Sequence, residues 1–237
     1  MTDAETAWAD HYTLPPKGNM MITPQAFIEG GTRIFATIER TIAEFLPGRR
    51  IEEMEILDFG CGVGRVALPF FYKYKRPTAC VDLPKIYVDY LKGQIPGANP
   101  ARSRNEPPLP YPDESFDVVY SISVFTHLNP EMGAAWLKEM HRLLKPGGLA
   151  LLSTSSHAQL AWHRIAREEL WEGVSDEIFE AEGIVFRGEF MKGMGGIYGC
   201  TVHTSEWVKA NWSKVFTVKD TRVRAVGGTQ DLNILMK

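Results

Sequence analysis

The sequence predicts an α/β protein in which a mostly parallel sheet carries helices on both faces. Three observations lead to this prediction. Short apolar runs alternate with segments of helical spacing over residues 49–156, which is typical of parallel strands joined by crossover helices. One run, EILDFG, leads directly into alternating glycines, as at the ligand-binding corner of an open sheet. The last segments, KVFTVKDTRVR and DLNILMK, are joined by Gly227 and Gly228, which predicts an antiparallel pair at the sheet edge.

The N-terminal part begins irregularly and then forms one long helix. Residues 1–22 contain prolines and a glycine and are expected to be irregular. Thr23 can cap a helix, and apolar residues recur at helical spacing until Pro47 ends it. Gly30 and Gly31 lie in the middle of this helix and are expected to weaken it.

The remaining elements follow from apolar runs and from the residues that begin and end them. Strands are predicted over EILDFG, TACVD, FDVVYSISVF and LALLSTS and over the two C-terminal runs. Helices are predicted over residues 63–74, after Pro84, from Asn129 to the KPGG motif, over residues 157–172 and over SEWVKANW. Residues 93–115 are expected to be mostly loop, and residues 183–200 are rich in glycine. These six strands include an antiparallel edge pair, and for the fold as a whole we expect a mostly parallel sheet of seven strands.

Charge and cysteine content exclude several classes of protein. The net charge is −3 and no run of like charges is long, so the sequence gives no electrostatic reason to expect a nucleic acid or membrane partner. Cys61, Cys80 and Cys200 lie far apart and form no CxxC pair. The six histidines show no HExxH pattern. We therefore expect neither a disulfide framework nor a metal site.

The glycine loop after the first strand distinguishes between two kinds of ligand. A dinucleotide fingerprint requires G-x-G-x-x-G, but counting from Gly60 and Gly62 puts Arg65 in the place of the third glycine. The glycines alternate instead, up to Gly64. Asp58 would face an anionic pyrophosphate unfavourably, whereas it suits a cationic ligand. These residues argue against a nicotinamide-dependent oxidoreductase.

A second acidic residue ends the next strand. Asp82 stands about 20 residues beyond the loop, where an acid can accept hydrogen bonds from both ribose hydroxyls. Leu83 follows it and would lie against an adenine ring. The alternative is that Asp82 caps the helix that Pro84 opens.

Four motifs together resemble a known family. ILDFGCGVGR, CVDLP, LPYPDESFDVVYSISVFTHL and LLKPGG are similar, in order and separation, to the landmarks of class I S-adenosylmethionine-dependent methyltransferases of the small-molecule type. The resemblance covers about residues 50–155 and implies a Rossmann-like fold with S-adenosylmethionine as cofactor. It assigns to the cofactor Asp58, Gly60, Cys61, Gly62 and Gly64 (methionine part), Asp82 (ribose), Leu83, Asn105 and Glu106 (adenine) and Ser121 (methionine tail). Asn105 replaces the aspartate that the family often has, and its amide oxygen can accept the same hydrogen bond.

The expected reaction is methyl transfer to a small molecule, at a hydroxyl oxygen, in a biosynthetic pathway. A hydroxyl acceptor needs a general base, and two histidines are candidates. His127 directly follows the strongest strand, and His203 lies just before the last helix. We favour His203, because His127 is so close to the methionine tail that it can serve the cofactor. Aromatic residues that could wall the acceptor pocket are Trp8, Tyr12, Trp162, Trp171 and Tyr198.

Several alternatives stay open at this point. The acceptor atom can be nitrogen or carbon, the protein can hold the cofactor without catalysis, and an NAD(P)-dependent oxidoreductase is the least favoured class. We expect residues 1–48 to form a cap over the active site. Residues 49–237 would form the methyltransferase domain, with residues 157–203 as a substrate-binding insertion or lid. The polar N-terminus and the lack of an apolar run of roughly 18 residues favour a cytoplasmic protein. Its expected partner is a small-molecule acceptor, with no nucleic acid or membrane, and a homodimer is one open state.

Overall fold

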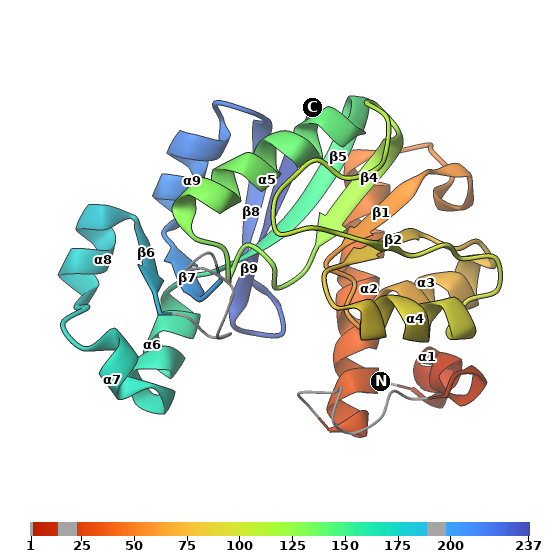
Figure 1. Cartoon of the computed structure of the whole chain (residues 1–237), viewed down its shortest axis with the longest axis horizontal. Coiled ribbons are helices and arrows are strands. Elements are labelled where there is room, and N and C mark those ends of the chain that lie inside the picture. The colour runs from red at the N-terminus through yellow and green to blue at the C-terminus, as the bar shows by residue number, and fades with distance from the viewer. Residues whose placement is uncertain (1, 14–22, 189–197) are drawn as a thin grey trace.

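The computed structural model describes residues 2–13, 23–188 and 198–237 and contains one central sheet with helices packed on it (Figure 1). The strands are β1 (Ile56–Phe59), β2 (Ala79–Asp82), β3 (Ala101–Arg102), β4 (Phe116–Ser121), β5 (Leu144–Ser155), β6 (Ile184–Arg187), β7 (Cys200–His203), β8 (Thr217–Val226) and β9 (Gln230–Met236). The predicted α/β class is confirmed.

The sheet has the order β3-β2-β1-β4-β5, which continues in two directions. β1 pairs in parallel with β2 and with β4, and β4 pairs in parallel with β5. On the far edge of β5, β9 runs antiparallel and carries β8 outside it. The antiparallel edge pair predicted from the C-terminal runs is therefore confirmed.

Two further strands extend the sheet beyond the expected seven. β7 pairs with β5 only at the end of that strand, Val202 opposite Ser155, and β6 is antiparallel to β7. β9 covers the other edge of β5 as far as Ser155, and β4 pairs with β5 only as far as Leu152. β7 therefore pairs with the same edge of β5 as β4 does, directly beyond the carboxyl end of β4.

The helices follow the predicted boundaries where a capping residue marks them. They are α1 (Asp3–Thr6), α2 (Pro24–Phe45), α3 (Ala67–Tyr74), α4 (Lys85–Gln94), α5 (Pro130–Leu143), α6 (His157–Ala166), α7 (Glu168–Trp171), α8 (Asp176–Glu182) and α9 (Ser205–Trp212), with 3₁₀ turns at Ala7–His11 and Ile51–Glu53. Thr23 accepts a hydrogen bond from the Ala26 N–H at 3.2 Å, and Asn129 accepts one from the Met132 N–H at 2.8 Å. Both caps satisfy a backbone donor of the first turn.

Several boundaries differ from the expectation. Residues 3–11, expected to be irregular, form short helical turns, and Trp8 is buried there. The predicted helix 157–172 breaks at Arg167, whose backbone is not helical. α8 was not predicted. β5 begins at Leu144, so the KPGG motif lies inside a strand with a register shift against β4.

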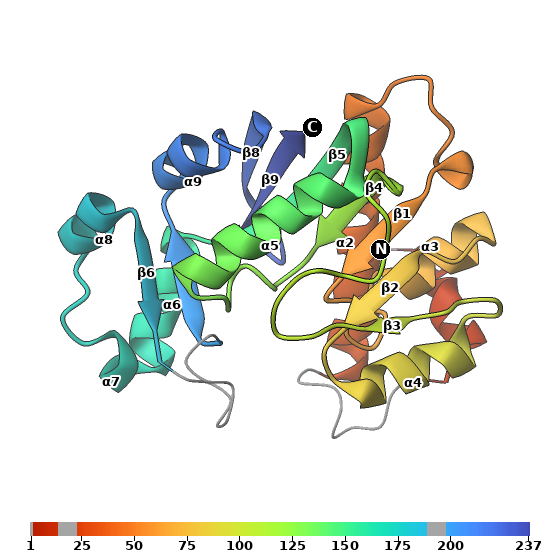
Figure 2. The same ribbon diagram turned by 45° about the horizontal axis from the view of Figure 1, so that its top comes forward.

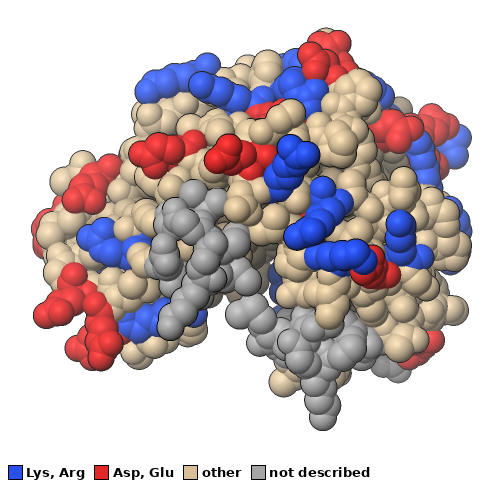
Figure 3. All heavy atoms as spheres, viewed as in Figure 1, with Lys and Arg blue, Asp and Glu red and all other residues tan. Residues whose placement is uncertain are grey.

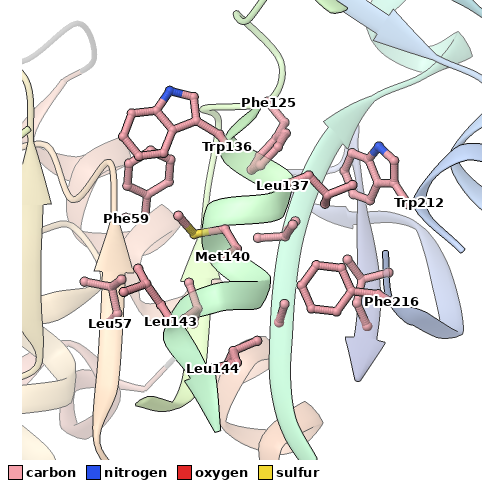
Figure 4. Close-up of a cluster of buried hydrophobic side chains, with 14 of the residues drawn as sticks. Leu57, Phe59, Phe125, Trp136, Leu137, Met140, Leu143, Leu144, Trp212 and Phe216 are labelled. Atoms are coloured by element: carbon pink, nitrogen blue, oxygen red, sulfur yellow. The ribbon is translucent and has the colours of Figure 1, made fainter. Parts of the chain in front are cut away.

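Two apolar layers hold the sheet between helices. On one face, α5 and α9 pack on the core cluster around Leu57, Val119 and Leu152 (Figures 2 and 4). On the other face, α2 packs Ile38 and Ile42 on the neighbouring strand residues. Burial of such side chains contributes about 1.5–3 kcal/mol each relative to exposure, so the sheet and its loops are a rigid base for a site.

The segment between β5 and α9 has an apolar cluster of its own. Leu160, Trp171 and Phe179 from α6–α8 are buried against β6 and β7, and in Figure 1 these elements form a separate lobe at the left. Within the described residues, no helix is both long and apolar enough to cross a membrane.

Candidate functional site

The glycine loop that follows β1 lies at the carboxyl edge of the sheet. Gly60, Gly62 and Gly64 all have positive φ, at +78°, +55° and +80°. A Cβ on Gly60 would meet Val124 and one on Gly64 would meet Leu91, whereas nothing lies within 4 Å of a Cβ on Gly62. The loop is therefore closely packed at both ends and open in its middle, where the backbone of Gly62 can lie against a ligand.

Asp82 ends β2 and faces this loop. Its Oδ2 accepts a hydrogen bond from the Gly62 N–H at 2.6 Å, and its Oδ1 accepts one from the Leu83 N–H at 2.7 Å. Burial raises the pKa of the carboxyl group, and these two hydrogen bonds oppose the rise. The carboxylate joins β2 to the open part of the loop, at the position predicted for the ribose.

Asp58 is almost completely buried at the end of β1. Its Oδ2 accepts a hydrogen bond from the Tyr120 hydroxyl at 2.9 Å. Burial raises the pKa of Asp58 to about 8; the Tyr120 bond and the charge of Arg65 lower it, and the nearby Asp82 raises it further. A buried acid with this balance gains most from a cationic ligand, because positive charge stabilises its ionised form.

The sequence did not indicate either partner of Asp58. Tyr120 is buried inside β4, and the sequence of a buried strand predicts only a core role for an aromatic residue. Arg65 was noticed only because it replaces a glycine, and its backbone packs so close to α2 that a Cβ on Gly31 would lie 2.4 Å from the Arg65 carbonyl oxygen. The sequence around Tyr120 and Arg65 therefore does not indicate that they share a site with Asp58.

Two of the three residues predicted for the adenine lie on the loop between β3 and β4, and the third, Leu83, follows β2. Asn105 and Glu106 are exposed, and the Asn105 backbone carbonyl accepts a hydrogen bond from Trp136 Nε1 at 3.3 Å. Leu83 is half-buried beside Asp82. These positions are compatible with an adenine pocket, which stays a prediction for all three residues.

Two remaining predicted residues are tied into the fold. Ser121 is buried, and its hydroxyl donates to the Phe59 carbonyl at 2.9 Å, which joins β4 to β1. The Cys61 thiol is buried within the loop. Both side chains are therefore packed into the protein, and their roles towards the cofactor stay predictions.

Ser123 lies close to the glycine loop and was not singled out by the sequence analysis. It follows β4 with a positive φ of 62°. Its N–H donates to Ser153 Oγ at 2.8 Å, and its hydroxyl bonds Gln230 at 3.1 Å. A non-glycine residue in this conformation is uncommon and is held by its surroundings. The three side chains join the ends of β4, β5 and β9 next to the glycine loop.

His127 connects this edge with the segment from residue 157 onward. Its Nδ1 lies 2.8 Å from the Gly199 carbonyl oxygen, and its ring stacks on Tyr198 with centroids 4.8 Å apart. Because a carbonyl only accepts, Nδ1 carries the proton and Nε2 carries the lone pair. Burial lowers the pKa of His127, the Gly199 bond opposes this, and the charge of Arg167 lowers it further.

Tyr198 brings the same segment towards the cofactor corner. Burial raises the pKa of its hydroxyl to about 12, with the charge of Asp82 as the next cause. Backbone bonds fix this junction: the Gly199 N–H donates to the His127 carbonyl at 2.7 Å, and the Thr201 N–H donates to the Thr126 carbonyl at 2.8 Å. The backbone bonds and the ring stack therefore place His127 and Tyr198 together.

His203 occupies a place that does not suit the role expected for it. It is a residue of β7, not of a loop that closes over the site, and it is buried. Burial lowers its pKa to about 3, far below the value a general base needs near neutral pH. It packs against Trp207 and Trp212 between α5 and α9. The preference for His203 over His127 is therefore reversed.

The aromatic residues suggested for the acceptor pocket are scattered. Trp8 is buried and donates from Nε1 to Thr32 Oγ1 at 2.9 Å, and Trp171 is buried in the lobe. Trp162 is about half exposed on α6. Only Tyr198 lies beside a candidate catalytic residue. Residues 189–197 of the glycine-rich segment, which we expected to act as a lid, lie outside the described residues.

Comparisons with known proteins concern mainly the part of the chain that carries the glycine loop. Residues 57–152 match the family described as Methyltransferase domain. The chain is 32% identical to the tRNA N(3)-cytidine methyltransferase METTL2 of Gallus gallus over 47% of this chain and 33% of that protein. It is 27% identical to the ubiquinone biosynthesis O-methyltransferase of Rickettsia akari over 55% of this chain and 51% of that protein. The chain thus matches only a third to a half of the length of these relatives.

Solved structures show the same fold at low identity. One is a protein of Pyrococcus horikoshii, with a TM-score of 0.58 and 20% identity over 86% of this chain and 89% of that one. Another is an S-adenosylmethionine-dependent methyltransferase of Mesorhizobium loti, with a TM-score of 0.56 and 15% identity over 86% of this chain and all (100%) of that one.

Fold and site together define a Rossmann-like α/β protein. Its candidate cofactor corner, formed by the glycine loop 60–64 with Asp58 and Asp82, favours a cationic ligand. Residues 57–152 form a methyltransferase domain, and the chain shares its Rossmann-like fold with S-adenosylmethionine-dependent methyltransferases. The residues present fit S-adenosylmethionine, because an open glycine backbone at Gly62 stands between two acids, Asp58 and Asp82. Among the described residues there is no group of three His, Cys, Asp or Glu side chains that could hold a metal.

Proposed function

We propose that the protein transfers the methyl group of S-adenosylmethionine to a hydroxyl of a small-molecule acceptor. The observation that carries this proposal is the hydrogen bond of His127 Nδ1 to the Gly199 carbonyl, 2.8 Å long, with Tyr198 stacked on the ring. This bond places the proton of a neutral imidazole on Nδ1 and the lone pair on Nε2. A base is needed for a hydroxyl acceptor and not for an amine that is neutral when bound.

In this proposal, different residues of the chain bind the cofactor, position the acceptor and accept the proton. Asp58 and Asp82 bind the charged and the ribose parts of the cofactor, which supplies the methyl group. Loop packing fixes the donor, and the lobe fixes the acceptor, so that the reacting atoms meet in line. His127 Nε2 takes the hydroxyl proton as the oxygen is methylated, and the bond from Nδ1–H to Gly199 holds the ring.

The segment 157–203 supports the choice of acceptor class. We infer that it is the substrate-binding part, because its Tyr198 and Gly199 reach the cofactor corner while α6–α8 form a lobe with a core of their own. Tyr198 of this segment stacks on the ring of His127, and the charge of Arg167 lowers the pKa of His127. This favours an acceptor with a ring or an apolar body.

A second candidate is methylation of tRNA, which is suggested by the METTL2 relatives. Proteins that bind nucleic acids neutralise phosphates with clustered Lys and Arg. This chain has a net charge of −3, and on the face shown in Figure 3 acidic and basic side chains are interspersed. The charge distribution favours the small molecule, and the experiment below includes both.

Formation of S-adenosylhomocysteine tests the two candidates together. The purified protein is incubated with S-adenosylmethionine and, separately, with a panel of small phenols and alcohols, the matched amines, and total tRNA. We expect turnover with a hydroxyl compound that is lost in His127→Ala. Methylation of tRNA alone, or of amines with His127→Ala fully active, would contradict the proposed acceptor.

A further inference from the structure

A cavity lies between α5 and α9, away from the cofactor corner. Its volume is about 240 Å³, and in Figures 1 and 2 the two helices lie side by side. Phe125, Leu128 and Leu137 form one wall, and Trp207 and Trp212 form the other. Figure 4 shows Phe125, Leu137 and Trp212 together near the beginning of α5. Neither the glycine loop nor Asp82 contributes to its described lining.

One polar side chain deep in this cavity has an unmet hydrogen-bonding group. His203 lines the cavity and is 5% exposed, and its Nδ1 has no hydrogen-bond partner among the described residues. Burial keeps the ring neutral, with a pKa of about 3. A buried polar nitrogen without a partner is unfavourable, and a bound molecule with a polar group can supply the missing hydrogen bond.

The aromatic walls favour a flat occupant. The ring of His203 lies 5.4 Å from that of Trp207 and 6.1 Å from that of Trp212, and Phe125 meets Trp212 edge to face at 5.4 Å. These rings form a narrow apolar slot next to the imidazole. A planar ring can stack or pack by its edge against such side chains.

The rim of the cavity is cationic. Lys138 of α5 and Lys214 after α9 both line it, and both are exposed. Lys214 Nζ is held 2.9 Å from Asn211 Oδ1. No acidic residue belongs to the described lining. An anionic group at the mouth is therefore favoured, whereas a cationic one is repelled.

We propose that this cavity binds a small planar molecule with an apolar ring, a polar ring atom and one anionic group. The ring lies between Phe125 and the two tryptophans, the polar atom bonds His203, and the anion lies between Lys138 and Lys214. This site is separate from the proposed catalytic centre. Phe125 and Leu128 line the cavity, whereas His127 does not and bonds Gly199 instead.

Calorimetry with two indoles of opposite charge tests this proposal on the whole chain without any acceptor. Indole-3-acetate and tryptamine share the ring and its N–H and differ in the charge of the side chain. We expect one site for indole-3-acetate per chain, with at least about tenfold weaker binding of tryptamine, because each rim charge contributes up to about a factor of five. Quenching of tryptophan fluorescence gives an independent measure.

Three variants and one control place the site. Leu137→Trp fills the cavity and should abolish binding, and His203→Phe should weaken it about fivefold through the lost hydrogen bond. Lys138→Glu with Lys214→Glu should weaken it by more than about tenfold. The control is Lys92→Glu with Lys219→Glu, which makes the same charge change at exposed positions elsewhere and should leave binding unchanged.

The outcomes are decisive in both directions. Loss of binding in the rim variant but not in the control supports the site, even if Leu137→Trp does not fold. No binding of indole-3-acetate, equal binding of tryptamine, or equal binding in the rim variant and its control overturns the proposal. Because no methyl transfer is measured, these results are independent of the proposed activity.

Discussion

The two candidate histidines differ in what their ring nitrogens contact. His127 has a fixed tautomer, because its Nδ1–H points to the Gly199 carbonyl. His203 is neutral at any pH above about 3 and lines a cavity away from the glycine loop. The position of a histidine in the sequence says nothing about either property, because both depend on which strand and which carbonyl the fold brings to the ring.

The first prediction compares these two residues. We expect His127→Ala to lower turnover by about 10²- to 10⁴-fold, the range for a lost general base, with cofactor affinity nearly unchanged. His203→Ala should keep turnover within about threefold, since the same reasoning gives it no proton to move. Steady-state kinetics at saturating acceptor measure both.

A pH profile separates a base from a residue that only shapes the pocket. Wild-type turnover should rise with pH through the pKa of His127, which burial holds below its ordinary value, because Nε2 must be unprotonated. In a variant such as His127→Gln, turnover should no longer fall at low pH, so the acidic limb of the pH profile should be lost. If the limb persists in His127→Gln, another group is the base.

The second prediction concerns Asp58, whose pKa of about 8 leaves it mostly protonated near neutral pH without cofactor. A cationic ligand favours the carboxylate, so binding releases a proton. Affinity for S-adenosylmethionine should then rise with pH, by at most about tenfold per unit, until the pH passes the pKa of Asp58, and level off above it. Calorimetry in two buffers of different ionisation enthalpy measures the released proton.

Variants identify the group that loses this proton. Tyr120, Arg65 and Asp82 are the charged or titratable groups that act on Asp58. Asp58→Asn should remove most of the proton release, whereas Asp82→Asn should weaken binding and retain it. The ammonium of the cofactor titrates in every variant and cancels in the comparison. An unchanged proton release in Asp58→Asn would exclude this assignment.

At the scale of elements, α2 and the glycine loop hold each other in place. Gly30 and Gly31 were expected to weaken this helix, yet it is continuous from Pro24 to Phe45. Only Gly31 lies against the loop, where a Cβ would approach the Arg65 carbonyl to 2.4 Å, while Gly30 has open space. One glycine is thus a contact between helix and loop, and its neighbour is not.

The third prediction uses this neighbouring pair as variant and control. Gly30→Ala should raise the free energy of unfolding by up to about 1 kcal/mol, from helix propensity alone. Gly31→Ala should lower it by about 1–3 kcal/mol, because the helix must move away from the loop. Thermal and urea unfolding compare the two. Equal stabilisation by both alanines would show that α2 and the loop are not closely packed.

At the scale of the whole molecule, the sequence could predict what depends on local chemistry. The caps at Thr23 and Asn129, the loop of alternating glycines and the C-terminal strand pair are set by residues adjacent in the chain. The β6–β7 hairpin could not be predicted, because only its pairing with Ser155 makes it part of the sheet. The partners of Asp58 and His127 come from Tyr120 and Gly199, 62 and 72 residues away.

The last prediction follows from the junction of the two parts of the molecule. The charge of Asp82 contributes to the raised pKa of Tyr198, and residues 199 and 201 donate backbone hydrogen bonds to the loop that carries His127. A cofactor held by Asp82 should therefore restrain both the glycine loop and this junction. Amide exchange should slow at residues 60–64 and 198–203 when S-adenosylhomocysteine binds, because opening either segment then requires release of the ligand.

The β8–β9 pair is the internal control for that measurement. Its hydrogen bonds run along the far edge of the sheet, so exchange at residues 217–226 should not change. Tyr198→Phe keeps the ring that stacks on His127 and removes the hydroxyl near Asp82. In this variant, ligand binding should slow amide exchange at residues 198–203 less than in the wild-type protein. The slowing of exchange at residues 60–64 should be unchanged. Protection confined to residues 60–64 in the wild-type protein would mean that the cofactor and the lobe are not coupled, and that the acceptor alone brings His127 into place.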